Sequence, residues 1–84
     1  MNTIFWTRKA VKQLLKIHRE HQVQIRDAVS TLSDMPDVGN VKKLVHHDYG
    51  YRMRVGQYRI LFDWEGILKV VSIQEVKKRD ERTY

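Results

Sequence analysis

The sequence contains no cysteine, a single proline and only four glycines. The missing cysteine excludes disulfide scaffolds, thiolate zinc sites and cysteine nucleophiles. No apolar run approaches the roughly 18 residues that a membrane-spanning helix needs. The first residues carry their charges after a short apolar stretch, which is the reverse of a signal peptide. A glycine-rich phosphate loop is also missing. We therefore expect a cytoplasmic chain with no membrane partner and no nucleotide-binding fold.

The size and charge of the chain limit the number of domains and the kind of partner that it can have. Its 84 residues, 42% of them apolar, suffice for one two-layer core, so we predict a single domain over residues 1–84. Sixteen Lys and Arg against ten Asp and Glu give a net charge of +6. Three basic stretches, residues 7–19, 42–59 and 76–84, alternate with two acidic ones. Such an excess favours a polyanion or an acidic protein as partner where the charge is focused.

The first half of the chain predicts a strand and two helices. Residues 3–6 are β-branched and aromatic, and Thr7 suits a helix N-cap. The first helix extends through His18, which we expect to be partly buried, and His21 then lies solvated in the turn. The second helix covers about residues 22–33. One face of the first helix is basic, and it either contacts a polyanion or an acidic partner or only keeps the helix soluble: Lys9, Lys12, Lys16 and Arg19.

The second half has the period of two that is typical of strands. We predict strands at residues 51–55, 58–63 and 67–76, preceded by a loop with a short segment at 41–45. Gly56-Gln57 suits a two-residue hairpin turn. The predicted order is β-α-α-β-β-β, an α+β fold with two N-terminal helices packed on one face of a small, mainly antiparallel sheet.

The hairpin places arginines in an unusual position. A turn at Gly56-Gln57 sets Arg54 directly opposite Arg59, with Arg52 on the same face. Like charges across a strand pair destabilise it by roughly 0.2–1 kcal/mol, so folding does not account for this choice. A phosphate between the strands would turn the repulsion into attraction, since arginine binds phosphate bidentately. The alternative is a salt-bridge network with Asp63, Glu65 or Glu75.

Several of these residues together resemble a known family. The string Tyr-Arg-x-Arg-Val-Gly-x-Tyr-Arg-Ile at residues 51–60, Lys43-Leu44 before it and Glu-Val-Lys-Lys-Arg-Asp at residues 75–80 resemble the RelE/ParE superfamily of bacterial toxins. The resemblance covers nearly the whole chain and leans toward the RelE branch. RelE-type members are ribosome-dependent endoribonucleases that cut mRNA in the A site by attack of the ribose 2′-hydroxyl on the scissile phosphate, without a metal or cofactor.

The resemblance implies roles for particular residues. Arg59 matches the arginine that stabilises the phosphate, Arg79 a second arginine at the strand end, and Tyr84 a C-terminal tyrosine that stacks on a base. Arg52 and Arg54 stand where the RelE type member has lysines, and they suit charge stabilisation rather than proton abstraction, because arginine stays protonated. RNA contacts are expected from the neighbouring basic and aromatic residues Lys42, Lys43, Lys78, Tyr49 and His47.

The general acid and base are not identified by this pattern. His46 and His47 titrate near neutral pH, and Glu75 is a further candidate whose alternative role is a salt bridge with Arg79 or Lys77. A metal site at the His-His-Asp string is not expected, because no further ligand cluster accompanies it. Tyr49 and Tyr84 are better base-stacking candidates than Trp6, Tyr51 and Trp64, which we expect in the core.

Three functions are compatible with the resemblance. The first is a ribosome-dependent mRNA endonuclease neutralised by an acidic antitoxin. The second is a ParE-like inhibitor of DNA gyrase, which binds its target without nuclease chemistry. The third is an inactive toxin-like corepressor. Nothing in the chain resembles a helix-turn-helix, so DNA contact is expected only through the antitoxin.

Overall fold

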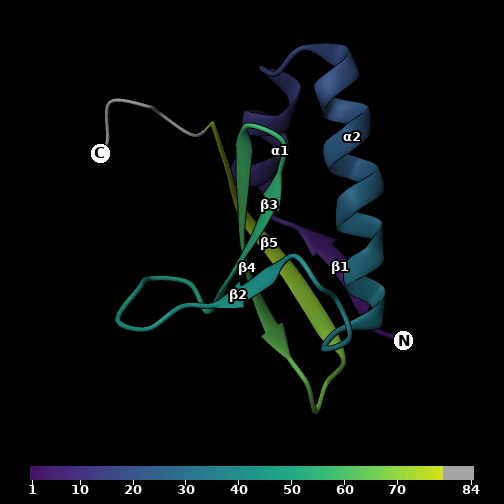
Figure 1. The fold of residues 1–84 in the computed structure, drawn as a ribbon, viewed down its shortest axis with the longest axis vertical. Coiled ribbons are helices and arrows are strands. Elements are labelled where there is room, and N and C mark those ends of the chain that lie inside the picture. The colour runs from purple at the N-terminus through teal and green to yellow at the C-terminus, as the bar shows by residue number, and fades with distance from the viewer. Residues whose placement is uncertain (79–84) are drawn as a thin grey trace.

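The computed structural model describes residues 1–78, which form two helices and a five-stranded sheet (Figure 1). The elements are β1 (Thr3–Trp6), α1 (Arg8–Leu15), α2 (Arg19–Ser30), the 3-10 helix η1 (Thr31–Asp34), β2 (Val41–Lys43), β3 (Tyr51–Val55), β4 (Tyr58–Glu65) and β5 (Val70–Lys78). The α+β class and the two N-terminal helices are confirmed. The predicted strand count was one too low, since the short segment near residue 41 pairs with β3 and becomes an edge strand.

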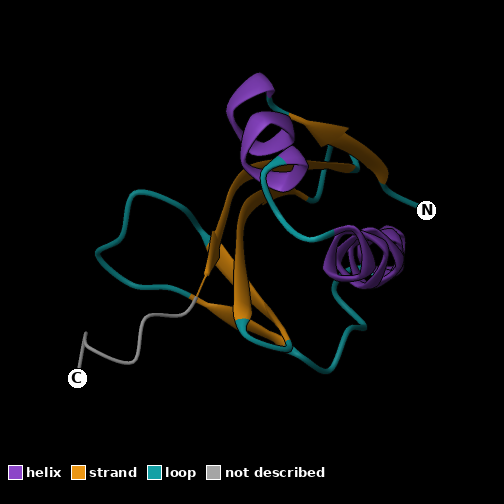
Figure 2. Cartoon of the chain, turned by 90° about the horizontal axis from the view of Figure 1, so that it is seen from above, coloured by secondary structure: helices purple, strands orange, loops and turns teal. Residues whose placement is uncertain are grey.

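The sheet has the strand order β1-β5-β4-β3-β2. β1 pairs with β5 in parallel, and every other pair is antiparallel, so the sheet is mainly antiparallel as predicted. Figure 2 shows both helices on one side of the curved sheet, while the β2–β3 connection projects from the other side. The helices therefore leave one side of the β3–β4 hairpin open.

The core lies between the helices and the sheet. Ile25, Val29 and Leu32 contribute a buried stripe from α2 and η1, and Met53, Ile60 and Phe62 lie fully buried on the hairpin. β5 starts later than predicted, at Val70, because the preceding residues form a turn that leaves Ile67 and Leu68 exposed. No helix within residues 1–78 is long and apolar enough to cross a membrane.

The junction between the helices differs from the prediction. α1 ends at Leu15, and α2 begins at Arg19 with exposed His18 as its N-cap, whose Nδ1 accepts a hydrogen bond from the Glu20 N–H at 3.3 Å. His18 is therefore neither in the first helix nor partly buried. His21 is half-buried rather than solvated, with its Nδ1 2.9 Å from the Tyr58 hydroxyl. The sequence pattern missed this break because helical spacing continues across it.

α1 packs along the part of β5 that extends beyond β1. Thr7 caps the helix by accepting the Ala10 N–H at 3.2 Å, and its own hydroxyl donates to the Gln74 carbonyl at 3.3 Å. The Gln13 Oε1 accepts the Val76 N–H at 2.7 Å. A side chain of α1 thus satisfies a backbone donor that an edge strand would otherwise expose. This contact fixes α1 against the end of β5 that lies beside the hairpin.

Candidate functional site

Three cations form a row across β3, β4 and β5. The register sets Arg54 opposite Arg59, as the sequence predicted, and sets Arg59 opposite Lys77. Gly56 has the positive φ of 56° that the hairpin turn requires, which fixes this register. We call these three residues the basic row. Their side chains share one face of the sheet, because directly opposed residues project to the same side.

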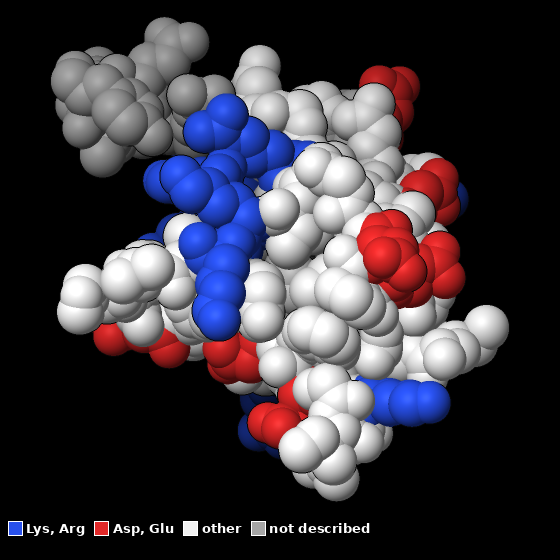
Figure 3. Space-filling model, turned by 60° about the horizontal axis from the view of Figure 1, so that its bottom comes forward, with Lys and Arg blue, Asp and Glu red and all other residues white. Residues whose placement is uncertain are grey.

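A second row lies beside the first on the same face. Lys42 is opposite Arg52, which pairs with Leu61, which in turn pairs with Glu75. Figure 3 shows Lys and Arg side chains gathered in one band on this side of the molecule, with most acidic side chains apart from it. Leu61, which lies between Arg52 and Glu75 in this row, is buried, with only 5% of its surface exposed.

Two of the predicted RNA-binding lysines have a different register. Lys43 is opposite Tyr51 and Lys78 is opposite Tyr58, and both tyrosines belong to the core face of the hairpin. The alternation of strand side chains therefore directs these lysines away from the basic row. Lys42 shares the face of the basic row, whereas Lys43 and Lys78 lie at the sheet margins.

Two of the hairpin arginines, Arg54 and Arg59, have no ion pair with an acidic residue among the described residues. Within residues 1–78, no ion pair joins Arg54 or Arg59 to a carboxylate, and the buried Nε of Arg59 has no hydrogen-bond partner. Asp63 is occupied elsewhere, accepting the Gly50 N–H at 2.8 Å and a Gln74 Nε2–H at 3.2 Å. For Arg54 and Arg59, the salt-bridge alternative thus has no support within residues 1–78.

Among residues 1–78, Glu75 is the carboxylate that forms an ion pair with the basic row. Its side chain is 10% exposed, with Oε1 3.1 Å from Lys9 Nζ and Oε2 3.9 Å from Lys77 Nζ. Gln13 Nε2 donates to Oε1 at 3.5 Å. The salt-bridge role is therefore confirmed for Lys77, and Lys9 is a closer partner that the sequence did not predict. A carboxylate held by so many donors is poorly suited to act as a general base.

The partners of Glu75 determine its ionisation. Burial raises the pKa of Glu75, but hydrogen bonds from Lys9, Tyr49 and Gln13 and the charge of Lys77 outweigh it and hold the pKa below its ordinary value. The hydrogen bond with Glu75 raises the pKa of Lys9, and the same carboxylate raises the pKa of Tyr49. Both groups therefore keep their protons at neutral pH.

The connection between β2 and β3 carries the histidine candidates. It closes through a hydrogen bond from the Leu44 N–H to the Gly50 carbonyl at 2.8 Å. His46 is exposed, and exposed His47 uses its Nδ1 to accept the Tyr49 N–H at 3.1 Å. Tyr49 is half-buried beside Glu75, so the structure brings it to the basic face. His47 organises the loop locally through one ring nitrogen.

Two of the aromatic residues predicted in the core, Tyr51 and Trp64, pack against it. Tyr51 stacks on Phe62 at a centroid distance of 5.5 Å, and Trp64 meets Tyr51 edge-on and donates its Nε1–H to Asn2 at 3.0 Å. These rings are part of the packed interior and not a stacking surface. Arg79 and Tyr84, which the resemblance assigns to the site, lie outside the described residues. No group of three or more His, Asp or Glu residues that could hold a metal occurs in the described part of the chain.

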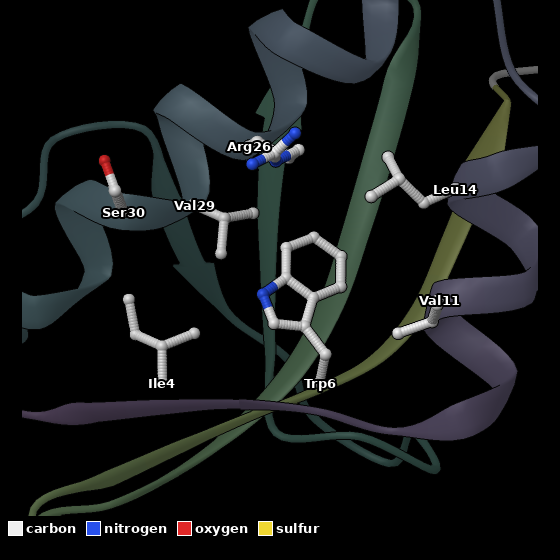
Figure 4. A pocket seen from close by; sticks show the side chains of 7 residues that line it. All are labelled: Ile4, Trp6, Val11, Leu14, Arg26, Val29 and Ser30. Carbon is white, nitrogen blue, oxygen red and sulfur yellow. The ribbon is translucent and has the colours of Figure 1, made fainter.

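An apolar groove lies between β1, α1 and α2. It has a volume of about 390 Å³, and Figure 4 shows side chains from β1, α1 and α2 converging on it. The lining residues are Ile4, Trp6, Val11, Leu14, Arg26, Val29 and Ser30. The sequence did not predict this groove, nor Lys77 as a member of the basic row, because both depend on which elements become neighbours.

Comparison with known proteins agrees with this fold. The chain superposes on RelE in the RelE–RelB complex of Pyrococcus horikoshii (24% identity, 95% of this chain and 97% of that one, TM-score 0.79). The RelBE2 toxin–antitoxin complex of Mycobacterium tuberculosis gives 23% identity, coverage of 93% and 98%, and a TM-score of 0.80. Isolated E. coli RelE is 17% identical, and the superposition covers 96% of this chain and 87% of that one with a TM-score of 0.80. Among curated proteins no significant relative is found.

The family assignment comes from the sequence. The profile of the ParE toxin of the parDE type II toxin–antitoxin system matches residues 4–82, nearly the whole chain. The matched residues include both helices and the basic hairpin. The chain therefore belongs to the ParE toxin family and is a type II toxin of the RelE/ParE superfamily.

Proposed function

We propose that this toxin is a ribosome-dependent endoribonuclease that cleaves mRNA in the A site and so inhibits translation. The observation that carries the proposal is the basic row, in which Arg54, Arg59 and Lys77 lie side by side on a rigid sheet. Neither arginine has an ion-pair partner within residues 1–78. Opposed cations on neighbouring strands cost stability, and a bound phosphodiester would remove that cost.

The reaction requires charge stabilisation above all. The ribose 2′-hydroxyl attacks the adjacent phosphorus, the O2′–P bond forms and the P–O5′ bond breaks, which leaves a 2′,3′-cyclic phosphate and a 5′-hydroxyl. The proton of the 2′-hydroxyl passes to a base, and the leaving 5′-oxygen takes a proton from an acid. Negative charge grows on the phosphorane oxygens during this step. Guanidinium donors fixed on β3 and β4 would stabilise that charge with little reorganisation.

The dependence on the ribosome follows from the proton chemistry. A guanidinium group supplies positive charge and is no proton acceptor, so neither Arg54 nor Arg59 serves as the base. Glu75 is surrounded by donors, and His47 uses one ring nitrogen within its own loop. We propose that the ribosome positions the substrate and organises the proton transfers, while Arg79 and Tyr84 act from the C-terminal residues. The isolated toxin should then cleave naked RNA slowly.

We propose that an acidic antitoxin neutralises the toxin in the cytoplasm. Two similar solved structures are complexes of a RelE toxin with a RelB antitoxin. A net charge of +6 favours an acidic partner, and the apolar groove offers Trp6 and Val11 to a partner's apolar side chains. Any contact with operator DNA would then be made by the antitoxin.

The nuclease proposal is tested by Arg59→Ala. Removing this guanidinium should lower the rate of mRNA cleavage on ribosomes by about 10²–10³-fold, the usual effect of losing one transition-state donor. Cleavage is followed by primer extension on a defined mRNA with ribosomes present. Thermal stability and antitoxin binding should stay close to wild type, since Arg59 makes no ion pair with residues 1–78. Lys69→Ala, which removes an exposed cation in the β4–β5 turn, is the control.

A second candidate is a ParE-like inhibitor of DNA gyrase. The observation in its favour is the match of residues 4–82 to the ParE toxin profile. The two functions differ in the first process that fails after the toxin is freed from antitoxin. Wild-type toxin that relaxes plasmid supercoiling while leaving mRNA intact would refute the nuclease proposal. Wild-type toxin that leaves growth unaffected would favour an inactive corepressor.

A further inference from the structure

A second basic surface lies on α1. It is a groove of about 400 Å³ lined by Arg8, Lys9, Lys12, Gln13 and Lys16, which we call the α1 basic groove. Lys9 is paired with Glu75, but no ion pair within residues 1–78 involves the other three cations. Lys12 and Lys16 are exposed. The groove therefore concentrates positive charge that the described residues do not neutralise.

The charges of this groove act against the stability of α1. The pairs Arg8–Lys12 and Lys12–Lys16 are like charges four residues apart, each costing roughly 0.2–0.5 kcal/mol. Cations also occupy the first turn, which has no acidic residue, at the positive end of the helix dipole. A helix of eight residues is only marginally stable on its own, so these costs matter. Lys12 in the last turn and Lys16 at the C-cap lie at the favourable end of the helix dipole, so the cost comes from the like-charge pairs and the cationic first turn. A bound polyanion would offset that cost.

The groove continues the surface of the basic row. Lys9 and Lys77 contact the two oxygens of Glu75, so α1 and β5 meet at this carboxylate. Gln13 fixes α1 to the same stretch of β5. Three strands span about 10 Å at the usual strand spacing, and a helix adds about another 10 Å. An extended strand of RNA that places one phosphate at the basic row can therefore place further phosphates along α1.

The lining favours RNA over a protein partner. Every lining residue is a cation or an amide, whereas the cores of protein interfaces are poor in lysine and rich in aromatic side chains. The opposite side of α1 has the apolar composition that a protein partner would use, with Val11 and Leu14 in the apolar groove. α1 thus separates a polar groove that suits phosphates from an apolar groove that suits a protein.

We propose that the α1 basic groove binds the phosphodiester backbone of RNA next to the phosphate held by the basic row. The proposal rests on the proposed RNA-directed function of the hairpin, and it assigns the groove to substrate placement. Lys12 and Lys16 would each neutralise one phosphate. Because phosphate contacts release counterions, their number can be read from the salt dependence of binding.

The test measures RNA binding separately from cleavage. The full 84-residue toxin, freed of antitoxin, is titrated into a fluorescent single-stranded RNA of twelve nucleotides that is 2′-O-methylated and therefore uncleavable. The variant is Lys12→Gln with Lys16→Gln, which keeps good helix formers. The matched control is Arg26→Gln with Lys69→Gln, which removes the same charge away from the groove. Circular dichroism melting checks that both variants fold.

The expected result is a loss of two phosphate contacts. The slope of log K against log salt should fall by about 1.4 for the Lys12/Lys16 variant, with affinity at least tenfold lower, and by much less for the control. Equal slopes for variant and control would overturn the proposal, as would an unchanged RNA affinity with weakened antitoxin binding. A toxin that shows the slope change but cleaves no mRNA on ribosomes would refute the nuclease function and retain this inference. Absence of RNA binding by the wild type would overturn this inference, while the nuclease function would still be decided by the cleavage assay on ribosomes.

Discussion

Replacing Arg54 by glutamate should stabilise the toxin while abolishing its nuclease activity. Arg54 is exposed and directly opposite Arg59, so the substitution converts a like-charge pair into an opposite-charge pair without disturbing the core. Loss of the positive charge beside the scissile phosphate should lower cleavage on ribosomes by about 10²-fold or more. The two effects have opposite signs, so a general loss of structure cannot produce them together.

The size of the stabilisation follows from cross-strand energetics. A like-charge pair costs roughly 0.2–1 kcal/mol and an opposite pair contributes a similar amount, so the change should be about 0.4–2 kcal/mol. For a chain of this size, 1 kcal/mol corresponds to a rise in Tm of about 4–8 °C. The effect is electrostatic and lies at the surface, so it should shrink at 1 M NaCl, where the screening length falls to about 3 Å.

The assay compares melting of wild type and Arg54→Glu by circular dichroism at low and high salt. Lys69→Glu, an equal charge change in the β4–β5 turn, controls for the lower net charge. A Tm that stays level or falls, or a gain that matches the control, would contradict the claim that the hairpin arginines repel each other. A stabilised variant with full cleavage activity would contradict their role in catalysis.

Two further predictions concern stability. Glu75→Gln should lower the free energy of unfolding at neutral pH by at most about 1 kcal/mol, because ion pairs with the largely exposed Lys9 and Lys77 are lost. Since the folded state lowers the pKa of Glu75, this contribution is present above the ordinary value of 4.5 and disappears as the pH falls below it, so denaturant titrations of the two proteins should converge in acid. Asn2→Ala should cost roughly 1–3 kcal/mol and change Trp64 fluorescence, because buried Asn2 accepts the indole N–H and donates to the Ser33 and Met35 carbonyls. Denaturant melts followed by tryptophan emission would measure that loss, and an unchanged midpoint would contradict it.

The hairpin is a part of the structure that the local sequence pattern predicts correctly. Alternation over residues 51–62 and the Gly56 turn specify the register, so the opposition of Arg54 and Arg59 could be predicted from the sequence. In a two-residue turn the glycine at positive φ leaves a single pairing, and a one-residue slip would expose Met53 and Ile60. The resemblance to RelE/ParE toxins has the same local origin.

The helix junction shows where local pattern fails. The apolar spacing of α1 continues through His18, yet the chain leaves the helix at Leu15, and His21 turns toward Tyr58. The contact between His21 and Tyr58 joins residues far apart in sequence, so only tertiary packing decides it. Strand β2 likewise exists because the edge of β3 accepts it, and a three-residue segment has too weak a pattern to predict.

By itself, the sequence determined the α+β class, the family resemblance and the three hairpin arginines, since each depends on residues close together in the chain. The tertiary structure decided which residues from distant parts of the chain come close to the hairpin arginines and to Glu75. Lys77 joins the basic row through the β4–β5 register, and Lys9 reaches Glu75 only because α1 packs along β5. It also divided α1 between an apolar groove and a basic one. Pairing between distant strands and helices is set by burial of the whole core, which short-range periodicity does not encode.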